Sequence, residues 1–62
     1  MEHWEAIAEY EDGFSIEKNF PYRANGNYAA EEREQYKIEC WLASFANKHG
    51  AWTYYTVNYI AE

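Results

Sequence analysis

Residues 4–20 read WEAIAEYEDGFSIEKNF and set the architecture of this 62-residue chain. Apolar and polar residues alternate on both sides of residues 11–13, and a period of two is typical of β-strands that bury one face. The pattern predicts a β-hairpin. A two-residue turn would set Tyr10 opposite Ser15 and mix the apolar and polar rows, whereas a three-residue loop at 11–13 keeps them apart.

The three-residue loop also predicts the register of the hairpin. Gly13 supplies the left-handed backbone conformation that such a loop requires. Lys18 is then the only charged residue on the apolar face of the hairpin. The expected opposite pairs are Tyr10 with Phe14, Ala8 with Ile16, Ala6 with Lys18, and Trp4 with Phe20.

A helix is predicted over roughly residues 28–49, after an irregular connection at 21–27 that contains the single proline. Asn27 is a suitable N-cap, and Gly50 is suited to the position after the helix. Glu31 and Glu34 interrupt the apolar stripe, so we expect the first two turns to extend past the sheet. The stripe itself comprises Ile38, Trp41, Leu42, Phe45 and His49.

Residues 52–60, WTYYTVNYI, are predicted to form a third strand with large side chains on both faces. A helical crossover lets this strand lie beside the first one, antiparallel to it, which gives the strand order 2-1-3. We expect Tyr55, Val57 and Tyr59 to face the helix. The uncovered face would then receive Trp52, Tyr54, Thr56 and Asn58.

These elements predict an α+β fold with ββαβ order, in which one helix packs on one face of a three-stranded antiparallel sheet. Residues 1–62 are expected to form a single small globular domain. A chain this short buries only about 60% of the surface that its unfolded form exposes. Its thirteen aromatic residues compensate, because each of them can bury about 150–250 Å².

The charge of the chain limits its partners. Eleven acidic residues stand against five basic ones, for a net charge of −6. This field repels nucleic-acid phosphates and anionic membranes, and it favours a protein partner with a basic surface. One cysteine and no signal peptide or membrane-spanning run indicate a cytoplasmic protein.

No motif in the sequence predicts catalysis, a metal site or a cofactor. His3, His49 and Cys40 lack the paired spacing of metal ligands, and Cys40 falls on the helix face opposite the apolar stripe. The acidic loop at residues 11–13 is followed by Phe14 rather than by further oxygen ligands, so it is a turn and not a calcium loop. We therefore expect a non-enzymatic protein without cofactors.

The uncovered sheet face is the predicted partner-binding surface. Trp52 and Tyr54 would be its anchors, because large amphipathic rings carry much of the energy of protein interfaces. Glu5, Glu9 and Glu17 would steer association with a basic partner. The complete predicted set is Glu5, Ile7, Glu9, Glu17, Tyr22, Trp52 and Tyr54.

Carboxylates spread over the sheet and the helix can imitate a row of phosphates. They are Glu5, Glu9, Glu11, Asp12, Glu17, Glu31, Glu32, Glu34 and Glu39. In size, acidity and lack of a catalytic motif the chain resembles the short accessory and anti-defence proteins of phages and other mobile elements, including anti-CRISPR proteins. This resemblance implies an inhibitor that occupies a basic site, including one that handles nucleic acid.

Three other interpretations of the same face remain open. It is an ordinary solvated surface, or it is buried in a structural or regulatory homodimer. Alternatively, Trp52 and Tyr54 stack on single-stranded nucleic acid, as sheet aromatics do in RNA-binding domains. The three glutamates on the face disfavour this last alternative, and only Arg23 in the neighbouring connection would assist it.

Overall fold

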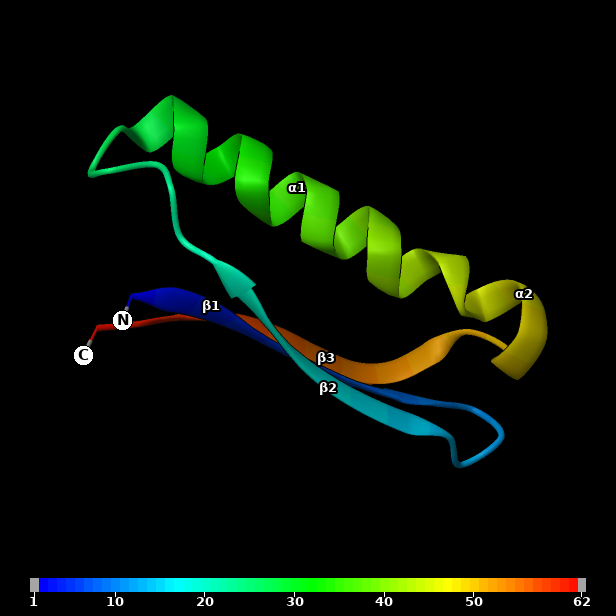
Figure 1. Cartoon of the computed structure of the whole chain (residues 1–62). Coiled ribbons are helices and arrows are strands. Elements are labelled where there is room, and N and C mark those ends of the chain that lie inside the picture. Colours follow the sequence, from blue (N-terminus) through cyan, green and yellow to red (C-terminus); the bar gives the residue numbers. More distant parts are fainter. Residues whose placement is uncertain (1, 62) are drawn as a thin grey trace.

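A computed structural model describes residues 2–61 of the chain. Its elements are β1 (His3–Tyr10), β2 (Ser15–Pro21), α1 (Tyr28–Ser44), α2 (Ala46–His49) and β3 (Trp52–Ile60). The strands form one sheet in the order β2-β1-β3, and both neighbouring pairs are antiparallel. Both helices lie on the same side of the sheet (Figure 1). The predicted α+β fold and strand order are confirmed.

The hairpin has the predicted register. The Tyr10 amide donates to the Phe14 carbonyl at 2.9 Å, and the Gly13 amide donates to the Tyr10 carbonyl at 3.0 Å. Gly13 has a φ of 91°, which a side chain would strain. The structure pairs Ala8 with Ile16, Ala6 with Lys18, and Trp4 with Phe20.

Small residues on β1 let the helix approach the centre of the sheet. Ala6 and Ala8 are fully buried, with Trp4 and Tyr10 almost fully buried at the two ends of the same row. From α1, Ile38 and Leu42 complete this core. We call the side of the sheet that carries this row the covered face.

Lys18, the charged residue expected on the apolar face, is accommodated at its edge. Its ammonium group lies 5.1 Å from the ring centre of Phe20 and 5.2 Å from that of Trp41. At these distances the ring faces attract the cation, while the side chain remains exposed to water. The charge therefore stays solvated, and its stem covers apolar surface.

The helix starts as predicted, because the Asn27 side chain accepts a hydrogen bond from the Ala30 amide at 3.0 Å. Its end differs from the prediction of one helix over 28–49, since a turn at Phe45 separates α1 from α2. The Leu42 carbonyl accepts from the Tyr10 hydroxyl at 2.5 Å and from the Phe45 amide at 3.2 Å. An amide bonded three residues back tightens the turn and interrupts the regular helix.

The two glutamates that interrupt the apolar stripe are held by aromatic donors. Trp4 Nε1 donates to Glu34 at 2.7 Å, and the Tyr22 hydroxyl donates to Glu31 at 2.6 Å. The start of α1 therefore keeps contact with β1 and with the connection after β2. Hydrogen bonds to the carboxylates offset the cost of placing these charges beside the core.

Candidate functional site

The side of the sheet opposite the helices has no covering element among residues 2–61 (Figure 1). We call it the open face. Alternation along the three strands puts the polar row of the hairpin there, as the sequence predicts. The open face carries Glu5, Ile7 and Glu9 from β1, Ser15, Glu17 and Asn19 from β2, and Tyr54, Thr56 and Asn58 from β3.

Ile7 and Tyr54 supply the apolar area of the open face. Ile7 lies at its centre, opposite Glu17 on one side and Thr56 on the other. Tyr54 is opposite Glu9 and is 54% exposed, so its ring is available to a partner. Apolar groups surrounded by charges are the usual layout of a protein interface with a polar rim.

The acids of the open face are not neutralised within the described chain. Glu5, Glu9 and Glu17 form no ion pair with any side chain of residues 2–61. Glu9 and Glu17 are exposed, and Glu5 is partly exposed. The face therefore presents three negative charges around Ile7 that no side chain of residues 2–61 pairs with, and Tyr54 lies opposite one of them, Glu9.

Trp52 is not on the open face, and the predicted placement is wrong. The pairing of β1 with β3 has a bulge at Glu9/Tyr10: Tyr54 is opposite Glu9, but Trp52 is opposite Tyr10. The extra residue, Thr53, breaks strict alternation and turns Trp52 to the covered face, where it packs against the core. No residue in this stretch signals the bulge.

Tyr22 is also separated from the open face. Its ring contacts Trp4 and Tyr59, with ring centres 5.5 and 4.8 Å away. Its hydroxyl donates to Glu31, and this hydrogen bond to a carboxylate is the main reason that the pKa of Tyr22 is raised. The structure thus brings together five of the seven predicted binding residues: Glu5, Ile7, Glu9, Glu17 and Tyr54.

Two tyrosines that were predicted to face the helix remain exposed at the side of α1. Tyr55 is 38% exposed and Tyr59 is 44% exposed, although both lie on the covered face. The aromatic residues of the helix region pack toward β2 instead, with ring centres 5.2 Å apart for Trp41–Phe20 and 5.8 Å apart for Phe45–Phe14. The helix therefore does not cover Tyr55 and Tyr59, and sequence reasoning missed the exposed surface on β3.

The hydroxyl groups of both tyrosines lie next to glutamate carboxylates. The Tyr59 hydroxyl donates to Glu2, and this hydrogen bond, with desolvation second, raises the pKa of Tyr59 to about 12. The Tyr55 hydroxyl lies 3.4 Å from a Glu39 oxygen. We name Tyr55, Val57 and Tyr59 the tyrosine row.

The hairpin loop is joined to the end of the helix by Asp12 and His49. His49 Nδ1 lies 2.7 Å from Asp12 Oδ2, and the imidazole stacks on Phe14 with ring centres 3.9 Å apart. The Asp12 amide donates to the His49 carbonyl at 3.3 Å. The imidazole thus links the hairpin loop to the end of the helix, and no nucleophilic side chain among the described residues is hydrogen-bonded to it.

Asp12 is expected to titrate below its ordinary pKa of 3.8. The Phe14 amide donates to its carboxylate at 2.9 Å and is the larger cause, and His49 is the next. Because the folded-state pKa is the lower one, these contacts stabilise the fold above about pH 4, and the contribution is lost as the pH falls through the folded-state pKa. NMR titration of the Asp12 carboxyl carbon measures this pKa.

The His49→Gln variant separates the two causes of the lowered pKa of Asp12, which are the Phe14 amide and His49. The pKa of Asp12 should rise only part of the way toward 3.8, because the Phe14 amide still donates. Full recovery of the ordinary value would mean that His49 alone lowers the pKa.

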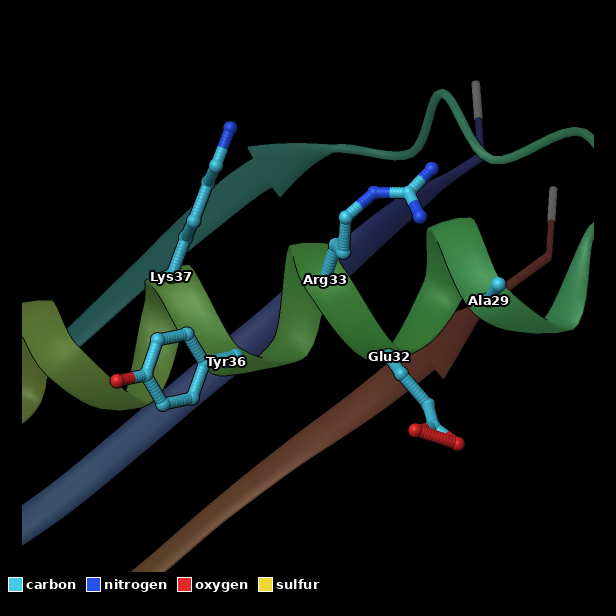
Figure 2. Close-up of a pocket in the computed structure, with 5 residues that line it drawn as sticks. All are labelled: Ala29, Glu32, Arg33, Tyr36 and Lys37. Atoms are coloured by element: carbon cyan, nitrogen blue, oxygen red, sulfur yellow. The ribbon is translucent and has the colours of Figure 1, made fainter.

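Two hollows lie in the surface of the described residues. One, of about 540 Å³, is lined by a single helix and lies on the outer side of α1 (Figure 2). In Figure 2, Arg33 and Lys37 point to one side of the helix and Glu32 to the other, so these polar groups do not converge. A smaller one lies between α1 and the end of β2, where Glu34 is already bonded to Trp4.

Within residues 2–61, no three His, Cys, Asp or Glu side chains are grouped so as to hold a metal ion. Cys40 is an exposed free thiol, on the outer side of the helix as predicted. None of the helices described in this range is long and apolar enough to cross a membrane.

The open face and the tyrosine row are thus the two surfaces with exposed aromatic side chains on the sheet. The chain matches no protein-family model, and it has no significant similarity to a curated protein or to a solved structure.

Proposed function

We propose that this protein is a non-enzymatic binding module whose open face occupies a basic site on a partner protein. The observation that carries the proposal is Tyr54, which is 54% exposed and lies opposite Glu9 and diagonal to Ile7, on a face whose three glutamates form no ion pair within residues 2–61. The ring of Tyr54 can be buried by a partner while its hydroxyl keeps a polar contact. Tyr54 is the anchor in this proposal, and Trp52 is no longer part of it.

The charges of the open face select the partner. Glu5, Glu9 and Glu17 add to the net charge of −6, so approach of a basic surface is favoured and approach of an acidic one is opposed. Removal of one of these charges should slow association and weaken its dependence on salt. The rate of dissociation should change less, because rim charges act mainly before contact is made.

The resemblance to short anti-defence proteins adds an inhibitor role to the proposal. Basic surfaces often bind nucleic acid, and an acidic module seated there excludes phosphates from the same site. The anti-CRISPR-like form of the hypothesis predicts that the partner loses its affinity for nucleic acid when this protein is bound. A competition titration with a labelled oligonucleotide tests this form of the proposal.

The central test compares Tyr54→Ala with Tyr36→Ala. Both remove an exposed tyrosine, but Tyr36 is 67% exposed on α1, away from the sheet. A partner captured from the native cell by the wild-type chain should bind Tyr36→Ala normally. It should bind Tyr54→Ala at least about thirtyfold more weakly, which corresponds to a loss of about 2 kcal/mol, the usual threshold for an interface anchor.

Isothermal titration with the captured partner gives these affinities, and sedimentation of the free protein gives its own association state. Equal affinity for Tyr54→Ala and the wild type would contradict the anchor assignment. If the open face is instead buried between two copies of the chain, Tyr54→Ala dissociates that dimer in the absence of any partner. Quenching of tryptophan fluorescence by an oligonucleotide in low salt would favour the nucleic-acid alternative.

A further inference from the structure

We propose that the outer edge of β3 pairs antiparallel with β3 of a second copy of this chain, so that the two tyrosine rows meet beside the shared edge. This inference does not rest on the proposed function, because the open face takes no part in it.

The edge of β3 has the features of a strand-pairing surface. β3 is an end strand of the sheet, and no other strand of residues 2–61 lies along its outer side. Its nine residues, WTYYTVNYI, include no charge, glycine or proline. Unpaired amides and carbonyls along such an edge are ready to bond to another strand.

The opposite edge of the sheet is protected in ways that β3 is not. β2 carries the charges Glu17 and Lys18, and it ends at Pro21, which has no amide to donate. Charges and proline are the usual means by which edge strands avoid pairing. Within β3 the bulge at Thr53 disturbs only the first residues, so Tyr54–Ile60 remain regular.

Two side chains of β3 are also exposed on the helix side, although Trp52 and Val57 pack against the core. The aromatic side chains of the helix pack on those of the hairpin, and Tyr55 and Tyr59 keep 38% and 44% of their surface exposed. An antiparallel pair related by a two-fold axis perpendicular to the sheet keeps both covered faces on the same side. The tyrosine row of one copy would then lie against that of the other, between the two helices.

The composition of β3 favours a second copy as the occupant of this edge. Two copies of a chain with a net charge of −6 repel each other, but β3 contains no charged residue and so adds nothing to that repulsion. An uncharged strand of aromatic and β-branched residues also suits antiparallel pairing with itself, where aromatic cross-strand pairs are stabilising. The two open faces would form one continuous acidic surface on the other side of the six-stranded sheet.

Sedimentation equilibrium and amide hydrogen exchange on the full chain, in reducing buffer, test the proposal. Successive amides of a strand point to opposite edges, so about half of the β3 amides cannot bond to β1. We expect a concentration-dependent dimer in which these outward amides become protected as dimer forms. Added salt should strengthen the dimer by screening like charges, whereas it should weaken binding to a basic partner.

Tyr55→Lys tests the side-chain contact, with Tyr36→Lys as the matched control. Both variants change the charge equally, but only Tyr55→Lys removes aromatic contacts and places like charges near the two-fold axis. Dimerisation should weaken at least about tenfold in Tyr55→Lys and remain unchanged in Tyr36→Lys. Slow hydrogen exchange of the β1 amides, as in the wild type, shows that each variant is folded.

Three results would overturn the proposal. One is a monomer at every concentration reached, and another is a dimer in which exchange of the outward β3 amides does not change. The third is a folded Tyr55→Lys variant that dimerises like Tyr36→Lys. A dimer lost in Tyr54→Ala but kept in Tyr55→Lys would instead locate the contact on the open face.

Discussion

Trp4→Ala is expected to remove a large part of the free energy of unfolding of the protein. Only 2% of the Trp4 surface is exposed, and its ring contacts Tyr22 and Tyr59 at centre distances of 5.5 and 6.0 Å. Truncation of a buried aromatic residue costs about 3–5 kcal/mol. A chain of this length has a total free energy of unfolding of about 3–9 kcal/mol, so this loss removes from about one third of it to all of it.

Trp4 also donates a hydrogen bond to a carboxylate, and the loss of this bond adds to the loss of stability in Trp4→Ala. Its indole N–H donates to Glu34 at 2.7 Å, and the alanine variant leaves that carboxylate without its aromatic donor beside the core. Trp4→Phe keeps a ring but no donor, and we expect an intermediate loss. Urea denaturation followed by far-ultraviolet circular dichroism gives the free energies. A loss of less than about 1 kcal/mol in Trp4→Ala, below even the usual cost of a partly buried contact, would contradict the assigned core.

Leu42→Ala is the second substitution with a large expected effect. Leu42 is fully buried, and its side chain fills the space above the alanines of β1. The loss of buried methyl groups and the cavity that remains should cost about 2–5 kcal/mol. For a domain of this size each lost kcal/mol lowers the midpoint of thermal unfolding by about 4–8 °C, which calorimetry measures directly.

Leu42→Met is the matched control for this cavity. Methionine conserves most of the volume, so its cost should stay below about 1.5 kcal/mol. The carbonyl of residue 42 still accepts from the Tyr10 hydroxyl in both variants, and the comparison therefore isolates side-chain packing. Equal losses in the two variants would mean that shape at this position matters more than volume.

The hairpin and the helix start could be predicted because their signals are local. The choice of a three-residue loop follows from the alternation of apolar and polar residues around residues 11–13, and the structure has that loop and that register. Asn27 caps the helix through its own side chain, three residues from the amide that it binds. Such interactions involve residues that are close together in the chain, so the local sequence is enough to predict them.

The candidate site was predicted only where alternation is regular. Glu5, Ile7 and Glu9 lie on the open face because β1 has no irregularity before Glu9. Trp52 was misplaced because the bulge at Thr53 depends on how β3 meets the end of β1, and no residue type marks it. Tyr22 was misplaced because its position depends on rings that are distant in sequence.

Alternation, turn residues and the cap were sufficient to predict the ββαβ order, the hairpin register and the acidic open face, since each depends on backbone preferences within a few residues. The lateral position of α1 depended on tertiary contacts, chiefly Trp41 with Phe20 and the Tyr10 hydroxyl with the Leu42 carbonyl. These contacts hold the helix over β1, the middle strand, and Tyr55 and Tyr59 of β3 stay exposed. Packing between distant side chains selects one helix position among several that share the same apolar stripe, so that position emerges only when the whole chain is folded.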